Sequence, residues 1–405
     1  MSSFDASLVI NVSHRLLTIL LLLVGAFVKK ICGDMNDMYA AEGGRRRWVW
    51  SQPGKYGTVL CQAFLGPLRR PTVIVSDYET AVDICCRRTK EFDRGSRNKE
   101  CVGFTAPYFH FTMESRDPRL KAHRKMLNGL MSQEFLHETA AERIYGTTIR
   151  LVALWTLKAT KAQGNSFSAR EDLYLATMDM ISSVAFDMNE AQCSLTSSIN
   201  QLKNYDSEFR LPTKTEILSL RVPYFDAVME ETLRCAAPAT LITRKATCDT
   251  HIGEYSIPKG TDLIVCLAGP GMTEERSIEH FEKAKPAAGI GGRQGVPAWP
   301  DGDIATYNPG RWLKKETDSN GHVREIFDPK AGPNLAFSIG PRQCFGKKQA
   351  LLQVKCMITL LLWSFDFDKV KSPLNSDEND RLNNNDIEES LVNRPKHCYV
   401  TAKIL

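Results

Sequence analysis

FSIGPRQCFGKKQA, residues Phe337–Ala350, places one cysteine in a tight loop. Cys344 lies between Gly340 and Gly346; an apolar segment, Asn334–Ile339, precedes it and a helix-like run, Lys347–Trp363, follows it. Glycine on both sides of the cysteine allows a sharp turn and lets the backbone approach a bulky group. We expect the sulfur near the N-terminus of the following helix, where the helix dipole and the free N–H groups favour a thiolate.

Two interpretations compete for this cysteine. A single cysteine is usually a small buried hydrophobic residue in a strand-to-helix loop. Here Phe337, Gly340, Arg342 and Gly346 accompany Cys344 at fixed spacing, and Arg342 offers a rigid positive fork to a carboxylate. A thiolate held in this way is a standard axial ligand of haem iron, the one that favours O–O cleavage. We therefore interpret Cys344 as an iron ligand.

The spacing F-x-x-G-x-R-x-C-x-G resembles the haem-binding signature of the cytochrome P450 monooxygenases, and the chain matches it at every defined position. The resemblance implies a mainly α fold with a small β portion and haem b as the cofactor, with Cys344 as the axial thiolate. It implies that Phe337 packs near the sulfur and tunes the iron. It also assigns the haem propionates to Arg342, Arg244 and Arg124.

The helix expected from Pro118 to Met131 carries a second part of this resemblance. Its basic residues, taken alone, form an ordinary solvated face. The family has a W-x-x-x-R pair on this helix that holds a propionate. This chain keeps the arginine as Arg124 but has Leu120 where the tryptophan belongs. The resemblance therefore implies that one propionate hydrogen bond is not supplied.

Glu231 and Arg234 lie three residues apart on one face of a helix expected over Pro223–Arg234. As a surface ion pair they would contribute little stability. They resemble the E-x-x-R motif of the family, whose partner is an arginine in a later segment that here reads NPGRW, with Arg311. The resemblance implies a structural trio that braces the segment before the cysteine loop.

The composition is that of a large globular protein. The chain has 405 residues, 43% hydrophobic residues and a formal charge of +5, which suffices for a large core and does not argue for nucleic acid. The longest basic cluster, Arg45–Arg47, suggests a membrane-proximal patch. The 12 cysteines are scattered, which indicates mostly reduced side chains facing the cytosol.

The N-terminus carries an apolar run of about 13 residues, Leu16–Val28, followed by Lys29 and Lys30. A comfortable membrane span needs roughly 17–25 residues. This apolar run has three possible interpretations: a cleaved signal peptide, a buried helix or an uncleaved signal anchor. The flanking lysines, and the lack of a clear small-x-small cleavage site after the run, favour the anchor. We expect an anchor over residues 1–30, a linker over 31–55 and a haem domain over 56–405.

The haem domain is expected to contain an internal deletion near residues 189–211. The family places several helices there, its F–I region, but this stretch is long enough for about one helix. The long helix in that region carries [AG]-G-x-[DE]-T, an acid and an alcohol that deliver protons during oxygen activation. Ala268-Gly269-Pro270 and Ala287-Gly289-Ile290 do not match this motif, because no acid–Thr pair follows them.

The secondary structure expected elsewhere follows local signals. A hairpin is expected within Tyr56–Ser76, and a capping box of Ser76 and Glu79 predicts a helix after it. Amphipathic periodicity predicts helices over Thr139–Leu157 and Glu171–Phe186.

The resemblance, closest to the filamentous-fungal branch, implies oxygenation of an apolar small molecule in secondary metabolism. Electrons would come from NADPH through cytochrome P450 reductase at the endoplasmic reticulum membrane. Lys347, Lys348 and Lys355 are candidates for meeting this acidic partner, although the simpler interpretation is a solvated helix face. Two alternatives remain: a haem-binding but catalytically impaired protein, and a fragment that only inserts into the membrane.

Overall fold

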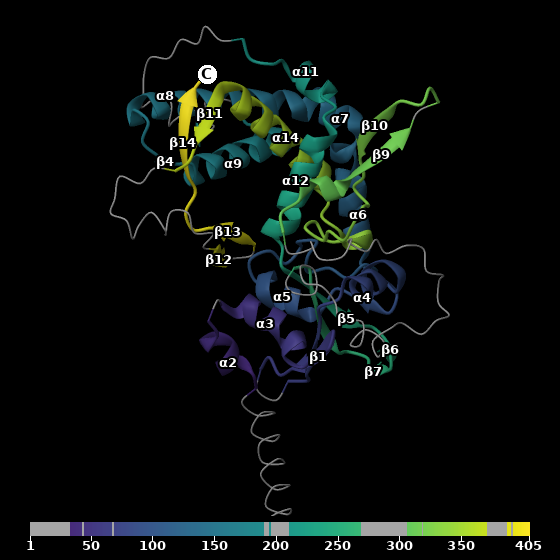
Figure 1. Ribbon diagram of the computed structural model, residues 1–405. Helices are drawn as coiled ribbons and strands as arrows, with labels where there is room; N and C mark the ends of the chain where they lie inside the picture. The colour runs from purple at the N-terminus through teal and green to yellow at the C-terminus, as the bar shows by residue number, and fades with distance from the viewer. Residues whose placement is uncertain are drawn as a thin grey trace, which may run out of the picture. The chain divides into compact units, whose positions relative to one another are not determined.

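The computed structural model describes residues 33–42, 44–66, 69–189, 194–195, 210–268, 306–317, 319–370, 387–389 and 392–405. The expected fold class is confirmed, since helices predominate and the strands form small sheets (Figure 1). The chain divides into two compact units. Unit 1 comprises Met1–Asp117 and Tyr224–Arg342, and unit 2 comprises Pro118–Pro223 and Gln343–Leu405.

Unit 1 is built on a five-stranded sheet with the order β1-β2-β8-β5-β3. Its strands are β1 (Leu60–Ala63), β2 (Thr72–Val75), β3 (Phe92–Asp93), β5 (Leu241–Ala246) and β8 (Asp262–Cys266). β1 and β2 form the hairpin that was expected from the sequence. Only the β2–β8 pair is parallel, and β2 and β8 bring apolar side chains to both faces of the sheet.

Helices and hairpins surround this sheet within unit 1. They are α2 (Met35–Ala40), α3 (Gly44–Lys55), α4 (Tyr78–Val82), the π-helical turn η1 (Asp83–Arg87), α5 (Ser96–Val102), α12 (Pro223–Ala236), η7 (Pro309–Trp312) and η8 (Gly340–Arg342), with the hairpins β6 (Thr250–Ile252)–β7 (Tyr255–Ile257) and β9 (Leu313–Thr317)–β10 (Val323–Phe327). The helix predicted over Pro223–Arg234 is confirmed as α12.

Two local expectations in unit 1 differ from the structure. The range 31–55, expected as a linker, contains α2 and α3, because Val49 packs with Ala63 and Ile74 of the sheet in a small core. Composition alone did not reveal this burial. The predicted capping box of Ser76 and Glu79 is wrong: Asp77 is the N-cap of α4, and its side chain accepts a hydrogen bond from the backbone of Thr80.

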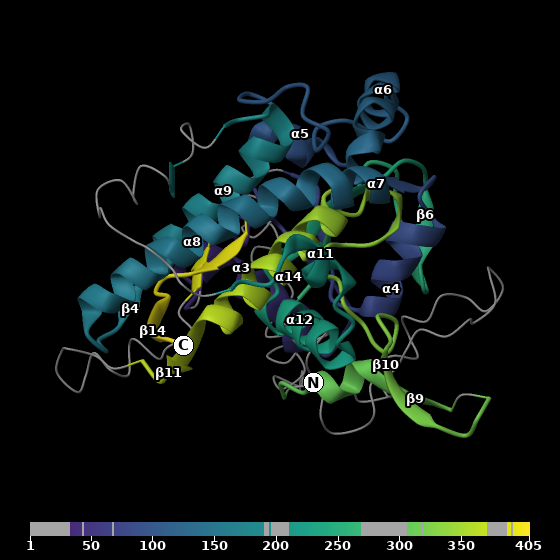
Figure 2. The same cartoon turned by 90° about the horizontal axis from the view of Figure 1, so that it is seen from above.

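Unit 2 is mainly helical. Its helices are α6 (Pro118–Leu127), η2 (Asn128–Met131), α7 (Gln133–Phe135), η3 (Leu136–Ala140), α8 (Ala141–Ala162), α9 (Arg170–Phe186), α11 (Lys214–Ser219) and α14 (Lys347–Ser364). Its strands are β4 (Phe167–Ser168), β11 (Phe365–Asp368), β12 (Ile387–Glu389), β13 (Asn393–Pro395) and β14 (Tyr399–Ile404). α8 lies beside both α9 and α14, as the two views show (Figures 1 and 2).

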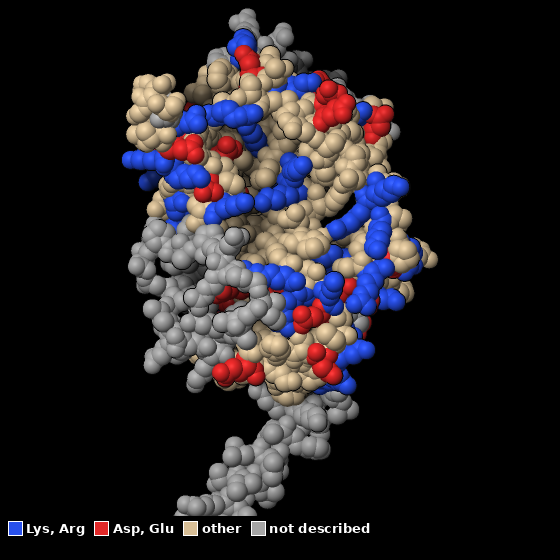
Figure 3. Space-filling view, turned by 90° about the vertical axis from the view of Figure 1, so that its right-hand side faces the viewer, with Lys and Arg blue, Asp and Glu red and all other residues tan. Residues whose placement is uncertain are grey.

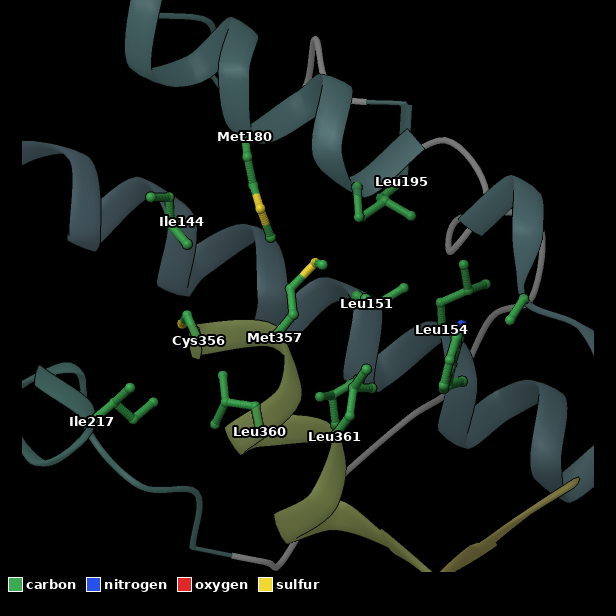
Figure 4. Close-up of a cluster of buried hydrophobic side chains, with 14 of the residues drawn as sticks. Ile144, Leu151, Leu154, Met180, Leu195, Ile217, Cys356, Met357, Leu360 and Leu361 are labelled. Carbon is green, nitrogen blue, oxygen red and sulfur yellow. The ribbon is translucent and has the colours of Figure 1, made fainter. Parts of the chain in front are cut away.

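The core of unit 2 lies between these three helices (Figure 4). Ile144 and Leu151 come from α8, Met180 from α9, and Met357 and Leu360 from α14, and all are buried. Each of these helices buries apolar residues against the other two or their neighbours, and this burial stabilises the unit.

The expected deletion near residues 189–211 lies mostly outside the described residues and stays a prediction. α9 ends at Phe186 and α11 begins at Lys214, and the few described residues between them hold no long helix. The Asp179 carboxylate accepts hydrogen bonds of 2.9 Å from the amides of Ser194 and Leu195, and Leu195 is buried in the core.

One face of α9 is exposed and apolar. Tyr174, Met178 and Ile181 lie at positions i, i+4 and i+7 and are 56%, 45% and 45% exposed. Such a stripe normally faces a packing partner.

The apolar run expected to anchor the chain, Leu16–Val28, lies outside the described residues. Among the helices that the structure describes, none is long and apolar enough to cross a membrane.

Candidate functional site

The cysteine loop joins η8 to α14. Cys344 is exposed and lies three positions before Lys347, the first residue of α14. Gly340 has φ +76°, and a Cβ built on it would lie 2.0 Å from the carbonyl oxygen of Cys85. Position 340 therefore requires glycine for two reasons: its backbone conformation and its close approach to η1. A Cβ at Gly346 would meet no protein atom within 4 Å, so packing within the described residues does not explain this glycine.

Arg342 is buried beside the loop that precedes α6. Its Nη2 donates to the backbone oxygens of His110, at 2.8 Å, and Met113, at 3.0 Å. Its Nη1 donates to the Ser115 hydroxyl at 3.3 Å, and that hydroxyl contacts the Asp93 carboxylate at 2.7 Å. These bonds fix the guanidinium two residues before Cys344.

Three buried arginines lie close together in unit 1. Arg244 is 2% exposed and Arg342 8%, and Arg94, which the sequence analysis did not single out, is 7% exposed. Burial, together with the charges of Arg244 and Arg342, lowers the pKa of Arg94 from 12.5 to about 9. The cluster is therefore positively charged and buried. Burying such charge is unfavourable, and a bound anionic group would offset it.

The structure divides the remaining predicted residues between the units. Arg244 and Arg342 both lie near Arg94 within unit 1, where Phe337 is half-buried. Arg124 lies on α6 and Cys344 precedes α14, both in unit 2. Leu120, which stands where the resemblance expects tryptophan, is 3% exposed and brings no donor.

Glu231 is the centre of a second network in unit 1. Its carboxylate, fully buried, accepts from Arg234 Nε at 2.8 Å and Nη2 at 2.7 Å, and from Arg311 Nε at 3.1 Å. The Asn308 amide and the Trp312 indole N–H each donate to it at 2.9 Å. The structure thus brings Glu231, Arg234 and Arg311 together, and adds two donors that sequence spacing did not reveal.

The network connects α12 to the segments that lead to the cysteine. Arg234 and Arg311 both donate to the backbone oxygen of Thr306, at 3.1 and 3.0 Å. One residue before Glu231, the Glu230 carboxylate accepts from the side-chain amide of Asn334 at 2.9 Å. α12 therefore holds the chain both at 306–312 and near the start of the cysteine loop.

We expect Glu231→Gln to lower the free energy of unfolding by about 3–5 kcal/mol, because Arg234 and Arg311 lose a buried counter-charge. Burial alone would raise the pKa of Glu231, but hydrogen bonds from Arg234, Asn308 and Trp312 lower it from 4.5 to about 2. The folded state therefore gains stability from this group above pH 4.5 and loses it as pH falls toward 2.

Urea unfolding of both proteins at several pH values measures this effect. Glu230→Gln is the matched control, because glutamine keeps an acceptor for Asn334. Equal losses in the two variants, or an unchanged acid dependence in Glu231→Gln, would contradict the central role of Glu231.

These features define the chemistry that the site offers. The exposed thiol of Cys344 precedes the N-terminus of α14 in unit 2. Unit 1 holds the buried arginine cluster that includes Arg342 and Arg94. In this cluster Arg94 Nε has no hydrogen-bond partner among the described residues. A thiolate binds a soft or borderline metal, and guanidinium groups bind carboxylates. Haem carries both kinds of group, an iron and two propionates.

Comparison with known proteins gives a consistent result. The family model described as "Cytochrome P450" matches residues 51–213, 213–275 and 299–398. "Cytochrome P450 monooxygenase TRI13" of Fusarium sporotrichioides is 24% identical, over 88% of this chain and 90% of that protein. "Hps1-dma1 cluster cytochrome P450 monooxygenase cyp3.1" of Dothistroma septosporum is 34% identical, over 48% of this chain and 61% of that protein. The first alignment extends over 538 residues, more than the 405 of this chain, so that relative contains residues without a counterpart here.

Proposed function

Because the chain belongs to the cytochrome P450 family, we propose that it binds haem b through Cys344 and derives from a monooxygenase of apolar small molecules. Its similarity to named fungal monooxygenases supports descent of this chain from an oxidoreductase. The observation that carries the proposal is the complete cysteine loop, with Gly340 fixed by η1 and Arg342 fixed by three hydrogen bonds. The word "cluster" in the name of one relative supports a role in secondary metabolism.

In this proposal each residue has a limited task. Haem, when bound, supplies the chemistry of oxygen activation. Cys344 ligates the iron as a thiolate. Arg342, Arg244 and Arg124 orient the propionates, Phe337 covers the sulfur, and Gly346 leaves room for a flat ligand. Glu231, Arg234 and Arg311 hold the loop in place.

The reduced carbon-monoxide difference spectrum of the full chain, expressed and supplied with haemin, tests the proposal. A thiolate-ligated iron gives a red-shifted band, and a neutral nitrogen ligand does not. Absence of any haem-dependent band would reject haem binding and leave the inert-fragment hypothesis.

We also propose an acidic reductase as the electron donor. Lys and Arg side chains spread widely over the face shown in Figure 3, with Asp and Glu scattered among them, and the chain has a formal charge of +5. Lys348 is exposed and donates to the backbone oxygen of Met131 at the long distance of 3.5 Å, whereas the half-buried Lys355 donates to the backbone oxygen of Leu220 at 2.8 Å. Lys348 is therefore the better candidate for this contact.

A second candidate function is a haem protein with little turnover. The missing acid–alcohol motif and the exposed apolar face of α9 favour it over an efficient enzyme. Haem binding is common to both candidates, so coupling of electron transfer to product formation distinguishes them.

For localisation we propose an N-terminal anchor in the endoplasmic reticulum membrane. Deleting residues 1–30 should move the protein from the membrane pellet to the soluble fraction, because Leu16–Val28 with Lys29 and Lys30 is then lost. Fractionation of both versions measures this. Recovery of the full-length protein from cells without these residues would instead indicate a cleaved signal.

A further inference from the structure

α9 is apolar on two opposite faces. On one face Ala176 and Met180 are buried, and Met180 points into the core of unit 2 (Figure 4). On the other face lie the exposed side chains of Tyr174, Met178 and Ile181. A helix that is apolar on more than one side is normally covered on each of them.

The neighbouring helix α8 shows what an ordinary exposed face looks like in this unit. The residues of α8 that are exposed are all polar: Glu142, Thr160 and Lys161. α9 packs beside α8 but presents apolar side chains at its exposed positions. The exposed face of α9 therefore calls for a packing partner in addition to α8 and α14.

The spacing of the exposed residues indicates that this partner is another helix. They follow one another at intervals of four, three and four residues: Tyr174, Met178, Ile181 and Ala185. These intervals are those of the seam between two packed helices, in which side chains of one helix enter gaps on the other. In an antiparallel pair of α9 helices Tyr174 would face Ala185, and Met178 would face Ile181, so a large residue meets a small one at each end.

The charges at the two ends of this seam favour the same arrangement. Glu171 is exposed one turn before Tyr174. At the other end Arg143 of α8 donates to the Ser183 carbonyl oxygen at 3.0 Å and pairs with Asp187. An antiparallel second copy would bring Glu171 toward Arg143 of the other copy, where it would share the guanidinium with Asp187. A parallel copy would instead set two Glu171 side chains side by side.

We propose that two copies of this chain associate through α9, with the seam of Tyr174, Met178, Ile181 and Ala185 packed antiparallel about a twofold axis. One patch then serves both subunits, as a twofold interface requires. A lipid surface fits less well, because residues 171–185 contain no Lys or Arg to attract anionic headgroups. One helix from each subunit makes a small interface, so we expect a weak dimer. This inference does not depend on haem binding.

Disulfide cross-linking between two differently tagged, co-expressed full-length chains tests the arrangement. Met178→Cys in one chain and Ile181→Cys in the other should give several-fold more mixed dimer on mild oxidation than two unsubstituted chains, whose exposed native cysteines set the background. Met178→Cys in both chains should give less cross-linking than the mixed pair, because the antiparallel axis lies between these positions.

Recovery of one tagged chain with the other measures the association without a cross-link. Ile181→Glu should reduce this recovery by about tenfold or more, because a charge would be buried in the seam without a partner. Glu171→Arg should reduce it by about two- to fivefold, the scale of an exposed ion pair. Lys161→Glu is the matched control on the exposed face of α8 and should change nothing. Urea unfolding at low protein concentration should be the same for Ile181→Glu and the unsubstituted chain, since Ile181 is exposed in the single chain.

Three results would overturn the proposal. Mixed cross-linking at the background level, with the two tagged chains recovered separately, would show that α9 meets no second copy. Labelling of Met178→Cys with a water-soluble maleimide would then identify lipid as the cover if detergent restores the labelling, and another part of the chain if it does not. More cross-linking between two Met178→Cys chains than in the mixed pair would show a parallel pair. An Ile181→Glu protein that unfolds more easily as a single chain would assign Ile181 to the fold instead.

Discussion

Cys344→Ser is expected to abolish the red-shifted carbon-monoxide band of the reduced, haem-supplied chain. An alcohol does not ligate iron as a thiolate does, and Cys344 is the cysteine of the complete F-x-x-G-x-R-x-C-x-G stretch. The side chain is exposed before α14, so the substitution should leave the packing of unit 2 intact. The expected result is complete loss of the band with little change in unfolding.

Two further variants make this experiment specific. Cys86 is also exposed and belongs to η1, the turn against which Gly340 packs, so Cys86→Ser is a matched control that should keep the band. Cys344→His should retain haem but give the unshifted band of a nitrogen ligand. A Cys344→Ser protein that kept the red-shifted band would assign the iron to another cysteine.

Much of the fold was predictable because its signals are local. α12 begins at a proline and carries an ion pair at i and i+3, and the β1–β2 hairpin follows from strand propensity. The N-cap of α4 was misassigned because both Ser76 and Asp77 are capping types. The Ser76 amide still donates to the Val59 carbonyl at 3.1 Å as part of the hairpin, so the next residue caps the helix. α3 was missed because its burial depends on the sheet below it.

The residues of the candidate site likewise separate into those with a local sequence signal and those without one. The residues at fixed spacing, such as Arg342, Cys344 and Glu231, were identified from their motifs. Arg94 and Trp312 were not, because what marks them is their contact with residues distant in the sequence. A basic residue directly after Phe92 and Asp93 was the only available signal for Arg94, and it has many ordinary explanations.

The chain as it stands is expected to consume NADPH and release hydrogen peroxide, with little oxygenated product, when reconstituted with a reductase. Efficient oxygenation needs protons delivered in order by positioned groups in a site that restricts water. The family supplies these groups from the acid–alcohol helix, a motif that this sequence lacks.

The ratio of peroxide released to NADPH consumed measures this expectation, with an alkoxycoumarin as the apolar probe whose dealkylation is followed by fluorescence. Reduction of O₂ to H₂O₂ takes the two electrons of one NADPH, so a fully uncoupled protein gives a ratio of about one. Cys344→Ser is the control for background oxidation by the reductase.

A longer version of the chain would decide what the deletion means. The Fusarium relative carries residues without a counterpart here. The exposed stripe Tyr174, Met178 and Ile181 on α9 is where we expect added residues to pack. If a longer transcript restores coupling and buries this stripe, the protein is an ordinary monooxygenase in its longer form. Efficient coupling by the 405-residue chain itself would contradict the expectation, because another segment would then have to exclude water and deliver protons above the haem.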